Sequence, residues 1–538
     1  MLDGPSQWRR NAILGVVALA PFNLSVPNEA WTGFGLRFLV IGSLVAVVAV
    51  VLSEFRASAT RVDWIDATAY FWLAAIWLSA LISNNVMLGG GSAARLSVAI
   101  LLLPALRSVV QSRHDCTLVL RALALGAGIA VLLAFFLWLF DQETIVGEAF
   151  VGRRTFLGPL SRLTKPWAHA NVAAMALGAS VASVATLRKQ WLVVTLATAI
   201  TIGLVLTVSR GGVIAGAAVA LGWVLLRRRR TDTLVVGGLV GVAVVTVLLS
   251  AAWGVRLDQL GDEAFFAANL DVPELVEAGG PSDLTSITIE NQSSVTFERE
   301  GDRQVLISAR WLGDDGLIWS EDWWQLPDDL APGETLTADL SLSPRVPVGT
   351  WQIRWDLLID QTAYFDQFLG KEPQLSRGEV SRTTVDPNNA EPYILVQRNV
   401  GISRNTGWRV AWQDFASSPL VGVGPNQFGG QAAPALAEEG QRVTAHAHNI
   451  LLEPLATWGL LGTVPFAVLG AVAAWRSFQQ AARTRRVEAC AVAVGLLAVG
   501  VHGIFDWPLV VITTGIPVGT LMGLALSMSN VADAVDER

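Results

Sequence analysis

Apolar runs of about 20 residues recur along this chain, and they limit what it can fold into more than any other feature. A helix needs about 20 predominantly apolar residues to cross the ~30 Å hydrocarbon core of a bilayer. Hydrophobic residues make up 52% of the 538 residues and charged residues 15%, a poor fit to a soluble globular protein. We place twelve spans at about residues 11–28, 33–53, 67–85, 92–110, 117–140, 171–188, 190–208, 211–226, 233–253, 459–476, 487–504 and 508–528. The sequence therefore predicts a polytopic membrane protein of predominantly α-helical fold.

Clusters of lysine and arginine between the spans set the expected orientation, because short cytoplasmic loops are enriched in both residues. With the twelve spans above, the basic clusters all fall on one side of the membrane, at residues 9–10, 56–61, 107–113, 188–189, 227–230 and 476–486. Both termini are therefore expected in the cytoplasm. The first run has no signal-peptide cleavage site and is followed by further spans, so we expect it to be retained.

The chain is expected to divide into three parts. Residues 1–253 hold nine spans and an external loop at 141–170, residues 254–448 form a large external loop, and residues 449–538 hold three spans. From about residue 285 to 385, polar and apolar residues alternate between turn sequences such as GDDG and APGE, which is typical of short half-buried strands. We expect an inserted β-sandwich, and its sequence resembles immunoglobulin-like accessory domains. Its tryptophans Trp319, Trp323 and Trp324 either fill the core or form a platform for sugar rings.

Two of the five histidines, His446 and His448, precede the tenth span directly. The predicted topology places them at the outer face, where the large loop re-enters the membrane. A histidine of near-neutral pKa can take a proton from a hydroxyl group and return it, so the pair is a candidate general base. The alternative is that each histidine only anchors a helix end at the interface.

A second candidate is the sequence TVSRGG, which holds Ser209, Arg210, Gly211 and Gly212 at the predicted outer end of a span. An arginine at membrane depth is costly unless it is paired or faces water, so Arg210 is a functional candidate. Its guanidinium can bind phosphate oxygens in a bidentate way, and glycines at a helix start leave N–H groups open to an anion. The alternative is a snorkelling arginine beside glycines that serve helix packing.

Positive charge also gathers on the predicted outside, against the usual distribution. The loop before the sixth span holds Arg153, Arg154, Arg162, Lys165 and His169, and Asn171 then opens that span as an expected helix cap. Arg409 and Arg442 add charge in the large loop. Cations kept on this side are expected to hold an anionic group. Near the outer end of the eleventh span, His502 and Asp506 lie four residues apart, a spacing that lets them pair on one helical face.

Four stretches in order along the chain resemble the O-antigen ligase family, which includes O-antigen polymerases and bacterial O-oligosaccharyltransferases. They are HANVAAMAL, SRGG, SPLVGVGPNQF and HNILLEPLATWGLLG. In the last, His448, Asn449, Gly459 and Gly462 occupy the places of the family's motif. Together with about twelve spans and one dominant loop, the resemblance covers nearly all of the chain except the sandwich insert.

The resemblance implies a membrane-embedded glycosyltransferase with a fold like that of glycosyltransferase class C, which needs neither a metal nor a cofactor. Such enzymes move a glycan from undecaprenyl pyrophosphate to an acceptor hydroxyl at the outer face of the bacterial cytoplasmic membrane. His448 matches the family's proposed general base, and Arg210 matches an arginine placed near the pyrophosphate. The loop cations and Asn171 correspond only by neighbourhood.

Three functions stay open at this stage. A ligase would move a finished glycan to a glycan, lipid or protein acceptor, a polymerase would join repeat units, and a transporter would also carry about twelve spans. A transporter is expected to show matching halves and polar residues at mid-membrane, whereas the ionisable residues here gather at the outer face. A nucleic-acid partner is not expected.

Overall fold

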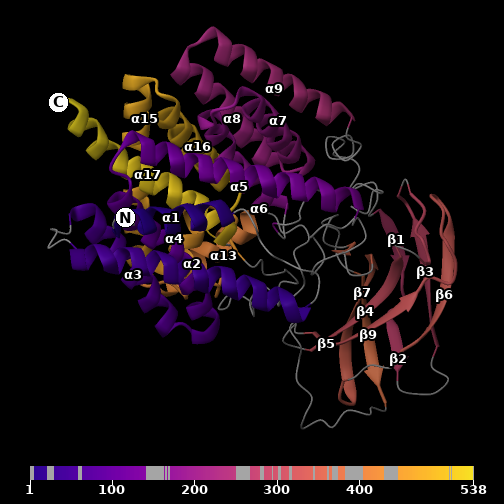
Figure 1. Ribbon diagram of the computed structural model, residues 1–538. Coiled ribbons are helices and arrows are strands. Elements are labelled where there is room, and N and C mark those ends of the chain that lie inside the picture. Colours follow the sequence, from indigo (N-terminus) through magenta and orange to yellow (C-terminus); the bar gives the residue numbers. More distant parts are fainter. Residues whose placement is uncertain are drawn as a thin grey trace.

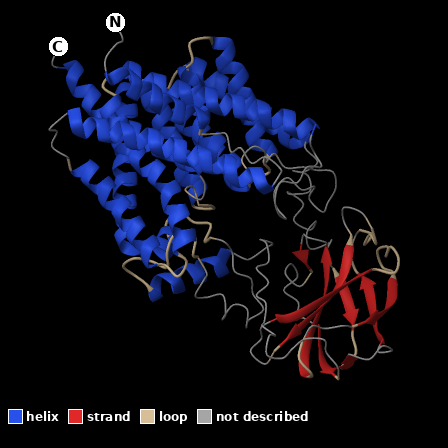
Figure 2. Ribbon diagram, turned by 60° about the horizontal axis from the view of Figure 1, so that its bottom comes forward, coloured by secondary structure: helices blue, strands red, loops and turns tan. Residues whose placement is uncertain are grey.

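The computed structural model describes residues 5–20, 29–57, 63–140, 163, 167, 170–249, 267–278, 284–293, 295–300, 304–313, 318–342, 346–359, 363–365, 374–381, 404–428, 446–507, 509 and 512–536. The helices form one body and the strands form another beside it (Figure 1). Figure 2 shows the same separation after rotation, with no strand among the described helices. The two bodies correspond to different patterns in the sequence, apolar runs in one and alternation in the other.

A described helix overlaps each predicted span. In chain order they are α1 (Pro5–Leu19), α2 (Glu29–Ala57), α3 (Trp64–Ile82), α4 (Val86–Val109), α5 (Arg113–Phe140), α6 (Ala170–Ser180) with the 3-10 helix η1 (Val181–Thr186), α7 (Gln190–Leu206), α8 (Arg210–Arg227), α9 (Arg230–Leu249), α13 (Arg404–Ser417), α15 (Leu452–Thr484), α16 (Val487–Gly503) and α17 (Ile512–Asp536). Each of the twelve predicted ranges overlaps one of these helices, with α6 and η1 sharing one range. Among the helices of the described residues, the amphipathic helix α13 lies outside these ranges.

Within the described residues, six helices are long and apolar enough to cross a membrane: α3, α4, the first part of α5, α8, α9 and α15. Five further apolar segments are shorter, at Val40–Phe55, Ala170–Thr186, Gln190–Leu206, Val487–Gly503 and Thr514–Met528. The chain is therefore mostly helical, with several apolar helices, as a membrane protein requires.

Described residues of several predicted basic clusters lie at one end of the helical body, which we call the basic end. Ion pairs there join different helices: Arg9 to Glu54, Arg10 to Asp115, Arg107 to Asp63 and Asp66, Arg113 to Glu488, and Arg227 to Asp232. Arg227 ends α8 and Glu488 begins α16, so the start of α8 and the end of α16 lie at the opposite end. We call this opposite end the site end.

The strands form two sheets. One has the order β1 (Ala268–Asp271), β3 (Leu284–Asn291), β6 (Thr335–Ser341), and the other has the order β2 (Leu275–Ala278), β9 (Gln374–Val380), β7 (Gly349–Ile359), β4 (Val305–Leu312), β5 (Ile318–Gln325), with β8 (Ala363–Tyr364) pairing β7. All pairs are antiparallel except β2 with β9. Both sheets contribute to one apolar core, for example Ile289 of β3 and Trp355 of β7. Two sheets around one core are the arrangement of a β-sandwich.

Candidate active site

The HN motif, His446–Asn449, is tied to the turn that follows α16. The N–H of Ile450 donates to the carbonyl of Gly503 at 2.7 Å, and Nδ2 of Asn449 donates to the carbonyl of Ile504 at 3.3 Å. Oδ1 of Asn449 accepts the N–H groups of Leu451 and Leu452 at the start of α15. Both ends of the Asn449 amide are thus occupied by backbone, so this residue fixes the place where two chain segments meet.

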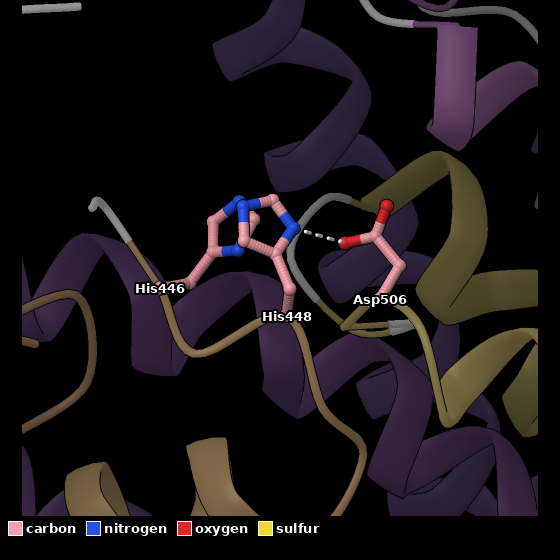
Figure 3. Close-up of side chains that lie close together, drawn as sticks. All are labelled: His446, His448 and Asp506. Atoms are coloured by element: carbon pink, nitrogen blue, oxygen red, sulfur yellow. Dashed lines mark hydrogen bonds and ion pairs between the residues drawn. The ribbon is translucent and has the colours of Figure 1, made fainter. Parts of the chain in front are cut away.

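Asp506 lies in that turn, beyond the end of α16 at Gly503, rather than on the helical face from which the pairing with His502 was expected. Its Oδ1 lies 3.0 Å from Nδ1 of His448 and also accepts the N–H of Trp507 at 2.8 Å (Figure 3). Burial by itself raises the pKa of Asp506, but the hydrogen bond to His448 and the imidazoles of His446 and His502 hold this pKa well below its usual range. Asp506 is therefore a carboxylate that accepts from His448.

This pairing decides the roles of the two ring nitrogens of His448. Nδ1 carries the proton that faces Asp506, which leaves Nε2 as the nitrogen able to accept another proton. The His448 side chain is 29% exposed, whereas Asp506 is buried. The backbone of His448 has a φ of +50°, a conformation that costs free energy in a non-glycine residue and is found more often at functional sites.

His446 lies directly against His448. The two ring centroids are 3.9 Å apart and the rings meet edge to face (Figure 3). Between them, the N–H of Ala447 donates to Oε2 of Glu453 at 2.6 Å, and Glu453 is buried in the first turn of α15. Sequence reasoning missed Glu453, although a carboxylate one turn into an apolar helix is a recognisable signal. It fixes the short stretch that carries both histidines.

The SRGG sequence forms the first turn of α8 at the site end. Oγ of Ser209 accepts the N–H of Gly212 at 3.2 Å, so Ser209 caps the helix. Val208, just before it, is buried with a φ of +52°, which is rare for a β-branched residue. Arg210 is exposed at the start of the helix.

The two glycines of this turn bring it against neighbouring helices. A Cβ at Gly211 would lie 3.3 Å from Cβ of Phe505 and 3.7 Å from Nε2 of His502. A Cβ at Gly212 would lie 2.6 Å from Cβ of Ala174, on α6 one turn after Asn171. The helix start that bears Arg210 therefore contacts the turn that bears Asp506, and the start of α6 lies on its other side.

The segment Pro419–Gly424, part of the motif SPLVGVGPNQF, forms backbone hydrogen bonds with α15 at the point where this helix is broken. Gly459 has a φ of +60° and a ψ of −163°, which are not helical. In a continuous helix the N–H groups of residues 460 and 461 would donate to the carbonyls of residues 456 and 457. Here they donate to Pro419 and Leu420 at 2.8 and 3.0 Å, while the carbonyls of Ala456 and Thr457 accept from Val423 and Gly424 at 2.9 and 3.0 Å.

The two backbones approach so closely that both sides need glycine. A Cβ at Gly459 would overlap the backbone of Leu420 and Val421, and a Cβ at Gly422 would overlap the backbone of Thr457. Gly422 also has a positive φ, of +69°. We call this exchange of hydrogen bonds between Pro419–Gly424 and α15 at Gly459 the splice. It fixes the first two turns of α15, which follow the histidines directly.

Gly462 admits the ring of Trp458, whose Cβ would lie 2.5 Å from a Cβ at this glycine. Trp458 packs against Trp507 with centroids 5.3 Å apart and against Trp72 at 6.0 Å. Trp507 directly follows Asp506 in the sequence, so this aromatic cluster packs against the turn that carries the Asp506 carboxylate. The motif glycines therefore act through packing.

Several predicted site residues lie outside the described part of the chain: Arg153, Arg154, Arg162, Lys165, His169 and Arg442. Two residues of the same cationic loop are described. The N–H of Leu163 donates to the carbonyl of Leu206 at 2.9 Å, one residue before TVSRGG, and Trp167 is fully buried beside α5 and α6. Arg409 is exposed on α13, whose apolar residues pack with Ala447 and Ala456.

The sandwich tryptophans divide between the two expected roles. Trp319 and Trp324 pack against the core, with ring centroids 5.4 Å from Trp351 and 6.4 Å from Trp355 respectively. Trp323 is 55% exposed on the outward face of the edge strand β5. A platform of all three rings is therefore not formed.

Residues 397–467 match the family described as O-antigen ligase. The matched segment contains α13, the splice at Gly459 and both histidines of the HN motif, whereas Arg210 and Asp506 lie outside it. The match confirms the resemblance found in the sequence. Together with the apolar helices, the match over this segment supports the resemblance of the chain to membrane proteins of the O-antigen ligase and polymerase group.

Among curated proteins, none matches this chain. A solved structure of Pseudomonas fluorescens alkylpurine DNA glycosylase AlkC, bound to DNA containing an abasic site analog, is 12% identical over 70% of this chain and 97% of that chain. Its TM-score is 0.16. A likeness this weak supports no conclusion about fold or function.

Proposed function

We propose that this chain, which matches the O-antigen ligase family over residues 397–467, moves a glycan from undecaprenyl pyrophosphate to an acceptor hydroxyl. The observation that carries the proposal is the hydrogen bond between His448 and Asp506, 3.0 Å long, which links the family's motif histidine to a buried carboxylate. The site end then faces the outside of the bacterial cytoplasmic membrane, and the basic end and both termini face the cytoplasm.

His448 acts as the general base in this proposal. Its Nε2 takes the proton of the acceptor hydroxyl while the oxygen attacks the anomeric carbon of the donor sugar. Asp506 holds the ring in the tautomer that leaves Nε2 free and stabilises the imidazolium that forms. Attack from the side opposite the pyrophosphate inverts the anomeric configuration.

Arg210 stabilises the leaving group. As the bond from the sugar to the pyrophosphate breaks, negative charge grows on the phosphate oxygens, and a guanidinium fixed at a helix start can bind them without a metal ion. The positive end of the α8 dipole adds to this effect. Support comes from the exposure of Arg210 and from the packing of Gly211 against Phe505 and His502, which joins this helix start to the turn of Asp506.

The remaining predicted binding residues differ in how directly the described contacts support a role for them. We propose that Arg153, Arg154, Arg162, Lys165 and His169 extend the pyrophosphate site, because Leu163, which lies between Arg162 and Lys165 in the sequence, is hydrogen-bonded to Leu206 next to TVSRGG. Arg409, Arg442, Asn171 and His446 are proposed to contact the glycan or its acceptor. Ser209 and Asn449 already bind backbone groups, so we assign them a supporting role with Gly211, Gly212, Gly459, Gly462 and His502.

The test is transfer in vitro from a purified undecaprenyl-pyrophosphate glycan, with His448→Ala, Arg210→Lys and the matched control His114→Ala. His114 is an exposed histidine at the start of α5, at the basic end. We expect no transfer by His448→Ala, a large loss for Arg210→Lys and normal transfer by the control. Normal transfer by His448→Ala would rule out the base. A ladder of glycan lengths among the products identifies a polymerase, and one modified acceptor identifies a ligase.

A further inference from the structure

His446, His448 and Asp506 bring three possible metal ligands together. One ring nitrogen from each histidine and one carboxylate oxygen all lie within 4.8 Å of one another. Figure 3 shows the two imidazoles side by side with the carboxylate beyond His448. The proposed proton transfer uses His448 and Asp506 and leaves His446 only a contact with the glycan or its acceptor, so a metal site would give this third group a second role.

Two imidazole nitrogens and one carboxylate oxygen are common ligands of Zn²⁺. In a tetrahedral site with bonds of about 2.0 to 2.2 Å, neighbouring ligand atoms lie about 3.3 to 3.5 Å apart. Nδ1 of His448 and Oδ1 of Asp506 are already 3.0 Å apart. The His446 nitrogen lies within 4.8 Å of both of these atoms, so the proposed site requires the His446 ring to move closer on binding.

We propose that Zn²⁺ binds between His446, His448 and Asp506 and inhibits the enzyme by occupying the base. On binding, the ion takes the place of the proton on Nδ1 of His448, and the neutral ring then carries its proton on Nε2. Nδ1 is bound to the ion and Nε2 is protonated, so neither ring nitrogen can accept the proton of the acceptor hydroxyl. Binding of the ion stands on the geometry alone, whereas inhibition rests on the proposed function.

The ligands sit on fixed backbone, which favours such a site. The N–H of Ala447, between the two histidines, donates to the buried carboxyl group of Glu453 at 2.6 Å. The bond from Ile450 to Gly503, 2.7 Å long, ties the histidine segment to the turn of Asp506. Because the His448 side chain is 29% exposed, water or a substrate oxygen can take the fourth coordination position.

The first experiment is calorimetric titration of ZnCl₂ into the purified full-length chain, carrying a tag without histidine. We expect one ion per wild-type chain and an affinity at least about tenfold lower for His446→Ala, His448→Ala and Asp506→Asn. The matched control His114→Ala removes an exposed histidine at the basic end and should bind as the wild type does. Equal affinity of His446→Ala and the wild type would overturn the site.

Cobalt gives a second measurement that does not depend on comparing affinities. Bound Co²⁺ should show visible absorption bands typical of a low coordination number in the wild type, and these should be lost in His446→Ala. Asp506→Asn preserves side-chain size, so a change in its spectrum reflects the lost carboxylate rather than a collapsed site. Identical spectra for all these proteins would contradict the proposal.

The last experiment distinguishes a failure of the proposed zinc site from a failure of the proposed function. Zn²⁺ should inhibit transfer by the wild type, and His446→Ala should need at least about tenfold more Zn²⁺ for the same inhibition. Transfer that continues at saturating Zn²⁺ overturns inhibition. A chain that binds Zn²⁺ but transfers no glycan without it confirms the site and contradicts the proposed function.

Discussion

Around His448, separate segments of the chain pack closely against one another at glycines, whereas in the β-sandwich the two sheets pack around buried tryptophans. At the site end, Gly459 and Gly422 allow two backbones to exchange hydrogen bonds, and Gly211 and Gly212 place α8 against its neighbours. In the sandwich, Trp311 and Trp355 are fully buried between the two sheets. Substitutions that add side-chain atoms should therefore destabilise the region around His448, and substitutions that remove side-chain atoms should destabilise the β-sandwich.

The largest effect is expected for Gly459→Ala. The new Cβ meets backbone atoms of Leu420 and Val421, which cannot rotate away, and the positive φ adds strain, for a combined cost of up to about 5 kcal/mol. Thermal unfolding in detergent and the transfer assay measure it. The control is Gly470→Ala on the same helix, where no atom lies within 4 Å of a Cβ, and this change should leave stability unchanged or slightly raised. Similar stability of the two variants would contradict the importance of the splice.

Trp311→Ala tests the opposite half of the comparison. Removal of a fully buried tryptophan should destabilise the sandwich by about 3 to 5 kcal/mol. Hydrogen exchange of the β4 amides in the full chain measures the loss, and the α15 amides should keep their protection. Trp323→Ala is the control, since that ring is 55% exposed, and its effect should stay within about 0.5 kcal/mol. Equal exchange in both variants would show that burial does not hold the sandwich together.

Asp506→Asn changes charge with almost no change in shape. Without the carboxylate, Nδ1 of His448 loses its negative partner, and transfer should slow by about 100-fold, mainly in kcat. The fold is affected as well. Because the pKa of Asp506 is lowered in the folded chain, its carboxylate stabilises the fold above the ordinary value of 3.8, and this contribution is lost as protonation proceeds below that pH.

The stability difference between the wild type and Asp506→Asn should therefore be present above about pH 4 and shrink as the pH falls further. Thermal unfolding between pH 7 and pH 3 measures it. A difference that grows in acid would reverse the sign of the assigned shift. Retention of full kcat by this variant would remove Asp506 from the mechanism.

The smallest effect is expected for Ser209→Ala, which removes the cap of α8. Loss of the hydrogen bond to the N–H of Gly212 should cost about 1 kcal/mol of stability. Thr at this position keeps the hydroxyl, so Ser209→Thr serves as the matched variant and should recover most of the loss. A larger effect on transfer than on stability would indicate that the hydroxyl also contacts the substrate.

The sequence by itself determined the helices, the strands and the motif histidine. Each predicted span overlaps a helix because a run of apolar residues is a local property, and alternation marks strands such as β6 for the same reason. His448 could be predicted as a candidate because its motif is contiguous with the start of α15. The fate of Trp319 and Trp324 was left open, since their neighbours come from other strands.

Only the tertiary structure decided what completes the site. The spacing of His502 and Asp506 suggested a pair on one helix, but α16 ends at Gly503 and Asp506 turns toward His448, 58 residues earlier in the chain. The position of Glu453 one turn into an apolar helix was recognisable in the sequence, but its partner Ala447 was not, and neither was the exchange of hydrogen bonds at Gly459. Such contacts depend on how separate helices pack, and no local pattern of residues records the partner that packing brings into reach.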